Sequence, residues 1–255
     1  MLKQLFILVF LITCSYANKT YESACDTNND QFIFSKSECI NYVYEEADDE
    51  NNLIIFLHGS WNEGTNILKK YTPLMEDLVL NTDVSTIVIA LPGYSKSSTN
   101  VFQAIGKKGF SSLIYTKEYL DLIKDVILQL KEKYKKKTLT LVAHSAGASL
   151  GTTLYGYDNT LIQNMISIAG SYTTDTKNSN LLSANKTYKN INKKSKLILI
   201  YGDKDKISPP KKSKDFYALV KKEQVNVKLI EVKNAVHLNL ELREEVMDEI
   251  LELLE

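Results

Sequence analysis

Residues 138–155 constrain the fold of this chain more than any other stretch. The aliphatic and β-branched run 139–143 predicts a short buried strand, and the small residues of 148–154 predict a helix. Ser145 lies in the turn between them, with Gly147 two positions later. Small residues around such a serine let a strand and a helix approach closely, which is the pattern of a nucleophile elbow. A strand-to-helix turn that merely contains a serine is the alternative, so the rest of the chain must decide.

The length and charge of the chain limit its class. Its 255 residues are enough to bury the core of one domain, and we expect a single domain over residues 18–255. The 31 basic and 31 acidic residues balance, so no net charge favours nucleic acid as a partner.

Residues 1–17 have the pattern of a secretory signal peptide. Lys3 precedes the apolar run 5–12, and residues 15–17 form a small-residue cleavage site. The run is shorter than the roughly 20 apolar residues that a membrane-spanning helix needs. We therefore expect a secreted or periplasmic protein without a stable membrane span after cleavage. An uncleaved anchor and a lipid anchor at Cys14 are the alternatives.

Cleavage after Ala17 would leave Cys25 and Cys39 as the only cysteines of the mature chain. An even pair in an exported protein predicts one disulfide between them, whereas a chain kept in a reducing compartment would hold two free thiols.

Strand and helix patterns alternate along the chain. Apolar or alternating runs predict strands at 31–35, 40–45, 53–57, 86–91, 139–143, 165–169, 196–201 and 227–232. Helical spacing predicts helices at 66–80, 116–136, 215–223 and 238–254, besides the one after the elbow. The alternation predicts an α/β fold with a mostly parallel, doubly wound sheet and helices on both faces. The functional site of such a sheet lies beyond the carboxyl ends of its strands.

A serine nucleophile needs an imidazole that accepts its proton. The chain has three histidines, and His58 and His144 stand inside loop and elbow motifs. His237 follows the last predicted strand, so elimination and position select it as the base.

An acid must hold that imidazole in its working tautomer. Asp203 and Asp205 both follow the strand predicted at 196–201. We prefer Asp205, because it stands at the tip of the turn before Pro209, while Asp203 suits a turn residue that accepts backbone N–H groups. Asp203 stays the alternative.

Taken in order, these motifs resemble the α/β-hydrolase family, in a version with a small cap domain or none. The resemblance rests on His58-Gly59-Ser60-Trp61, Pro92-Gly93-Tyr94-Ser95, Ala143-His144-Ser145-Ala146-Gly147, Gly202-x-x-Asp205 and His237. It implies the α/β-hydrolase fold, with Ser145 as nucleophile, His237 as general base and Asp205 as the acid that orients it.

The resemblance also implies an oxyanion hole and a substrate site. The backbone N–H of Ala146 would form the hole with that of Ser60 or of Trp61. Only residues 170–194 occupy the place where many members insert a cap domain, so the pocket should be open. We expect Trp61, Tyr94 and Tyr172 at the substrate site.

These features predict a secreted serine hydrolase that cleaves esters of small or medium acyl groups through an acyl-enzyme, with a small-molecule ester and water as its reactants. A thioesterase, a serine peptidase and a non-catalytic binding protein on the same scaffold are the alternatives. The sequence contains no metal-ligand motif, glycine-rich nucleotide motif or Cys-x-x-Cys pair, so we expect no metal and no cofactor.

Overall fold

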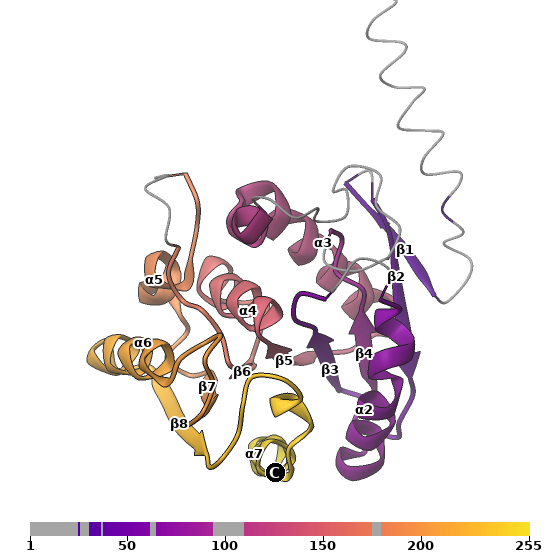
Figure 1. Ribbon diagram of the computed structural model, residues 1–255. Coiled ribbons are helices and arrows are strands. Elements are labelled where there is room, and N and C mark those ends of the chain that lie inside the picture. Colours follow the sequence, from indigo (N-terminus) through magenta and orange to yellow (C-terminus); the bar gives the residue numbers. More distant parts are fainter. Residues whose placement is uncertain (1–24, 26–30, 37, 62–64, 94–109, 175–179) are drawn as a thin grey trace, which may run out of the picture.

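An eight-stranded sheet organises the chain (Figure 1). The computed structural model describes residues 25, 31–36, 38–61, 65–93, 110–174 and 180–255, so the predicted signal peptide and Tyr94 lie outside the described residues. The strands are β1 (Phe32–Ser35), β2 (Glu38–Glu45), β3 (Asn52–Leu57), β4 (Thr86–Ile89), β5 (Thr138–His144), β6 (Asn164–Ile168), β7 (Lys196–Gly202) and β8 (Asn226–Val232).

The strand order is β1-β2-β4-β3-β5-β6-β7-β8. The first two pairings, β1 with β2 and β2 with β4, are antiparallel, and every pairing from β4 to β8 is parallel. From β3 the chain crosses to β4 on one side and returns to β5 on the other. Ligands of doubly wound sheets bind at such a switch point, beyond the carboxyl ends of the strands.

Helices cover both faces of the sheet (Figure 1). They are α2 (Ile67–Thr82), α3 (Lys117–Lys133), α4 (Ala146–Tyr157), α5 (Ala184–Thr187), α6 (Pro210–Lys222) and α7 (Glu244–Leu254), with the 3₁₀ turns η1 (Phe110–Tyr115), η2 (Tyr188–Asn190) and η3 (Leu240–Leu242). Successive side chains of β3 enter opposite cores: Leu53, Ile55 and Leu57 pack with α3 and α4, and Ile54 and Phe56 pack with α2 and α7. This is why β3 is continuously apolar.

The predicted fold class is confirmed, and the differences from the sequence analysis lie at element ends. The closing helix α7 begins at Glu244 rather than at residue 238, because Asn239 has φ 60° and the next residues form η3. Helix α6 begins at Pro210, earlier than predicted, since proline fits the first turn of a helix. Between β6 and β7 the described residues form only α5 and η2, so no large cap domain is built there.

Two further features of the structure are a disulfide and the character of its helices. Cys25 and Cys39 form the predicted disulfide, with their Cα atoms 5.5 Å apart, and it ties the residues before the sheet to β2. Within the described ranges, none of the helices combines the length and the apolar character needed to cross a bilayer.

We expect removal of this disulfide to lower the free energy of unfolding by about 3 kcal/mol, because it closes a loop of about 15 residues in the unfolded chain. Urea unfolding of the wild type and of the double variant Cys25→Ser, Cys39→Ser measures the difference. Reductant should weaken the wild type and leave the variant unchanged. Equal stability, or alkylation of both thiols without reductant, would contradict the prediction.

Candidate active site

Ser145 forms a strained turn between β5 and α4. Its backbone has φ 56° and ψ −116°, a region that L-residues rarely adopt, and its N–H donates to the carbonyl of Ile168 at 2.8 Å. The turn leaves the Ser145 side chain at the carboxyl edge of the sheet. This is the local geometry that the elbow pattern predicted.

The small residues around the serine have a steric reason. A Cβ atom on Gly147 would lie 2.2 Å from the carbonyl oxygen of Leu57 and 2.6 Å from that of His58. Helix α4 therefore packs directly against the backbone at the end of β3. On the other side, a Cβ on Gly59 would lie 2.9 Å from the Cβ of Ser145, so the loop after β3 also approaches the serine closely.

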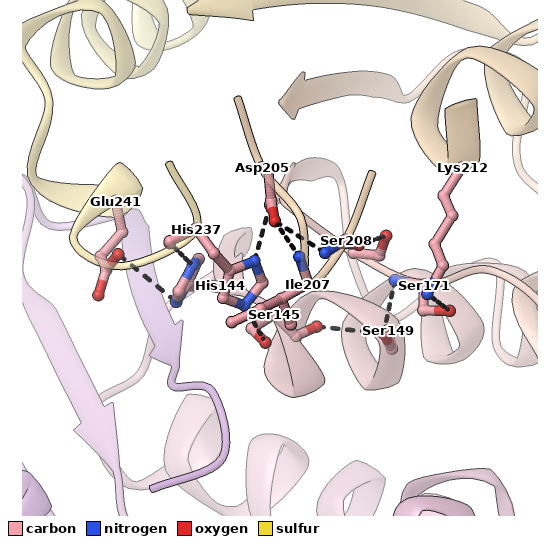
Figure 2. Close-up of polar contacts among 11 residues, drawn as sticks. His144, Ser145, Ser149, Ser171, Asp205, Ile207, Ser208, Lys212, His237 and Glu241 are labelled. Carbon is pink, nitrogen blue, oxygen red and sulfur yellow. Dashed lines mark hydrogen bonds and ion pairs between the residues drawn. The ribbon is translucent and has the colours of Figure 1, made fainter. Parts of the chain in front are cut away.

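Ser145, His237 and Asp205 form one hydrogen-bonded chain (Figure 2). The Ser145 hydroxyl donates to Nε2 of His237 at 2.8 Å, and Nδ1 of His237 donates to Oδ2 of Asp205 at 2.7 Å. The three residues follow β5, β8 and β7, so sheet topology brings them together. A base between a nucleophile and a carboxylate is the arrangement that activates a serine hydroxyl.

Asp205, not Asp203, is the acid beside His237. Oδ1 of Asp205 accepts the N–H groups of Ile207 and Ser208, each at 2.8 Å, which fixes the carboxylate in its turn. Burial alone would raise the pKa of Asp205, but the hydrogen bonds from His237 and from these two N–H groups lower it overall. Asp205 thus combines the orienting position with the turn contacts that the sequence analysis assigned to Asp203.

His58 braces the loop after β3. Its Nε2 accepts the N–H of Leu91 at 2.9 Å, so Nδ1 carries the proton and donates to the carbonyl of Gly59 at 2.6 Å. The imidazole is fully buried, and burial lowers its pKa to about 4. His58 is therefore neutral at physiological pH and fixed between two strands of the sheet.

A second buried polar group lies beside the triad, and no motif in the sequence indicates it. Nε2 of His144 donates to the carbonyl of His237 at 3.0 Å, and Nδ1 faces Oε2 of Glu241 at 3.4 Å (Figure 2). Tyr71 donates to the other oxygen of Glu241 at 2.9 Å and accepts the indole N–H of Trp61 at 3.1 Å.

Burial is the main influence on the pKa values of His144 and Tyr71. Burial lowers the pKa of His144, while the Glu241 carboxylate opposes this shift. Burial, and then the same carboxylate, raise the pKa of Tyr71, which stays protonated. Nδ1 of His144 and Oε2 of Glu241 face each other in an interior where each side chain is at most 3% exposed. Only long-range packing brings Glu241 to His144, and no local pattern in the sequence signals it.

A cavity of about 270 Å³ opens beside Ser145 and His237. Ser60 and Ala146, two of the predicted oxyanion residues, line it. Among the residues that the structure describes, no group of three or more His, Cys, Asp and Glu side chains is placed to hold a metal ion.

Two residues predicted at the substrate site lie elsewhere. Tyr172 is 2% exposed, its ring stacks on Phe216 at 4.3 Å, and its hydroxyl pairs with Ser167, so it packs in the core behind the cavity. The Trp61 indole packs edge-on against Tyr71, and the Lys70 ammonium lies 4.2 Å from the centre of the Trp61 ring. Trp61 is not part of the cavity lining. Tyr94 lies outside the described residues.

Comparisons with known proteins agree with this architecture. The family model described as alpha/beta hydrolase fold matches residues 52–184, just over half of the chain. The chain therefore belongs to the α/β-hydrolase family, and this membership supports a hydrolase. No curated protein matches the sequence.

Similar solved structures share the fold at low sequence identity. An esterase of Pyrococcus furiosus has a TM-score of 0.67 and 16% identity, over 89% of this chain and 91% of that one. Est1E from Butyrivibrio proteoclasticus, solved with ferulic acid, has a TM-score of 0.59 and 16% identity, over 87% and 98%. A monoacylglycerol lipase of Paleococcus ferrophilus has a TM-score of 0.61 and 17% identity, over 84% and 98%.

Gly147→Ala should destabilise the protein by about 3 kcal/mol or prevent folding, because the new methyl group meets rigid backbone. Gly151→Ala is the matched control on the same helix: its Cβ would meet the flexible ends of Leu141 and Met165 at 2.9 Å. That overlap is offset by the higher helix propensity of alanine, so we expect a change within about 1 kcal/mol. Urea unfolding measures both, and equal effects would contradict the steric explanation.

His58 should make stability depend on pH. Its pKa is about 4 in the folded protein and about 6.5 in the unfolded chain, so protons bind the unfolded chain first as pH falls. We expect the free energy of unfolding to drop by about 2 kcal/mol between pH 8 and pH 5 from this group. His58→Gln removes that contribution and leaves His144 and His237 in place. Parallel stability curves for wild type and His58→Gln would contradict the prediction.

Proposed function

We propose that this protein is a secreted serine hydrolase that cleaves carboxylic esters of small or medium acyl groups through an acyl-enzyme. The observation that carries the proposal is the hydrogen-bonded chain from Ser145 through His237 to Asp205 beside a cavity of about 270 Å³. Family membership and the esterases among the similar folds support it.

In the first half-reaction, Oγ of Ser145 attacks the ester carbonyl carbon while Nε2 of His237 takes the hydroxyl proton. The Asp205 carboxylate stabilises the imidazolium, since it already accepts the Nδ1 proton. The carbon–oxygen bond to the alcohol then breaks, and Nε2 gives the proton to the leaving alcohol. Water attacks the acyl-enzyme by the same steps and releases the acid and free Ser145.

The carbonyl oxygen becomes negatively charged in each half-reaction and needs hydrogen-bond donors. The backbone N–H of Ala146, at the start of α4, and that of Ser60 would supply them, with Trp61 as the alternative to Ser60. Each donor of this kind lowers the barrier by roughly 3 kcal/mol. The close approach of Gly59 to Ser145 supports a donor from this loop.

The surroundings of the site favour an ester with an apolar part. Val236 and Leu238 flank His237 and are 54% and 57% exposed, and Ile207, which lines the cavity, is 65% exposed. Large exposed apolar side chains at a site commonly contact a ligand.

Export forms part of the same proposal. The signal-peptide pattern of residues 1–17 and the Cys25–Cys39 disulfide both suit an oxidising compartment. The mature enzyme would then be the single domain of residues 18–255.

A fluorophosphonate probe should label the mature protein at Ser145, which mass mapping distinguishes from Ser149 in the same cavity. Ser145→Ala should abolish labelling, and His237→Ala and Asp205→Ala should lower kcat for a short-chain ester by about 10⁴-fold. Circular dichroism of each variant controls for folding. A folded wild type that neither reacts with the probe nor hydrolyses an ester, thioester or peptide substrate would leave a binding protein as the better interpretation.

A further inference from the structure

The cavity beside Ser145 is polar and contains a lysine. Eight of its fifteen lining residues are serine or threonine, and Lys212 of α6 is among the others. Figure 2 shows the Lys212 side chain reaching from α6 toward Ser171, where its Nζ lies 3.2 Å from the hydroxyl oxygen. The ammonium is therefore held at the cavity rather than extended into solvent.

Hydrogen bonds connect this lysine to the nucleophile. The N–H of Ser171 donates to Oγ of Ser149 at 2.8 Å, and that hydroxyl donates to the carbonyl of Ser145 at 3.1 Å (Figure 2). Lys212 thus lies two hydrogen-bonded residues away from Ser145. Lys212 and Ser145 line the same cavity, so a group bound at Nζ would share that cavity with the ester that Ser145 attacks.

Among the described residues, Lys212 has no carboxylate partner, unlike its neighbours Lys211 and Lys214. Lys211 pairs with Asp215 at 2.6 Å, and Lys214 pairs with Glu231 at 3.7 Å. Within the described part of the chain, Lys212 forms no ion pair, and no carboxylate lines the cavity. Helix stability does not explain the lysine either, because the first turn of a helix disfavours a cation.

We propose that this cavity binds an anionic group of the substrate, a carboxylate a few carbon atoms from the scissile ester carbonyl, with Lys212 as its counter-ion. The proposal rests on the esterase function above and names its substrate class, a monoester that keeps one free carboxylate. Hydroxyls such as those of Ser171 and Thr173 would donate the remaining hydrogen bonds to the carboxylate oxygens. A neutral sugar or alkyl group would explain the hydroxyls or the cavity, but not the unpaired ammonium.

This carboxylate can belong to the acyl part or to the alcohol part of the ester. Two pairs of substrates distinguish these two cases. Monomethyl glutarate against methyl valerate tests the acyl part. The butyryl ester of glycolic acid against propyl butyrate tests the alcohol part. For each pair, the measured quantity is the ratio of kcat/KM for the anionic ester to that for the neutral ester.

We expect the wild type to prefer the anionic member of one pair by about tenfold or more, and the preference to weaken as salt is added. Lys212→Met should lower this ratio by about tenfold or more, mainly through KM, and Lys212→Glu should invert the preference. Lys211→Met is the matched control, because Lys211 is 81% exposed on the same helix turn, and it should keep the wild-type ratio.

The outcomes separate this proposal from the proposed function. Hydrolysis of neutral esters with a ratio near one in wild type and Lys212→Met would overturn the anion site and leave the esterase standing. If no ester is hydrolysed, the esterase fails, and calorimetric titration of Ser145→Ala with glutarate tests the cavity alone. Binding that Lys212→Met abolishes in that background would support the anion site, and the absence of binding would overturn it.

Discussion

The packing of α4 against the carboxyl end of β3 is the contact on which this site depends. Gly147 allows it, because its Cα passes where any side chain would meet the carbonyls of Leu57 and His58. The contact forces the backbone of Ser145 into its positive-φ turn and sets the loop of Gly59 and Ser60 beside the serine. One steric constraint therefore places the proposed nucleophile and both proposed oxyanion donors, and the sheet only has to bring His237 and Asp205 to the same edge.

The sequence predicts the parts of this site that local pattern determines. The sequence predicts the elbow because a strained strand-to-helix turn needs small residues at fixed spacing. It predicts the strands because buried parallel strands are continuously apolar. The sequence favours Asp205 over Asp203 by its place at the tip of the turn, but it does not show that Asp205 itself accepts the N–H groups of Ile207 and Ser208.

Long-range packing determines the parts that the sequence does not predict. Tyr172 follows a strand end as a substrate-site residue would, yet its ring is turned into the core by Phe216 of α6, forty-odd positions later in the chain. The contact between His144 and Glu241 exists only because η3 passes over the end of β5. Lys212 belongs to a lysine-rich helix turn, where sequence alone gives no reason to separate it from Lys211.

Two hydrogen bonds join the elbow to His237, one to its ring and one to its backbone. Ser145 holds the imidazole by its Nε2, while the preceding residue, His144, holds the main-chain carbonyl of the same histidine. In the proposed acyl-enzyme, Ser145 would no longer donate to Nε2, while the second bond would stay intact. The His237 ring would stay bonded to Asp205 through Nδ1, so Nε2 would become available to an incoming water without a change in the backbone of His237.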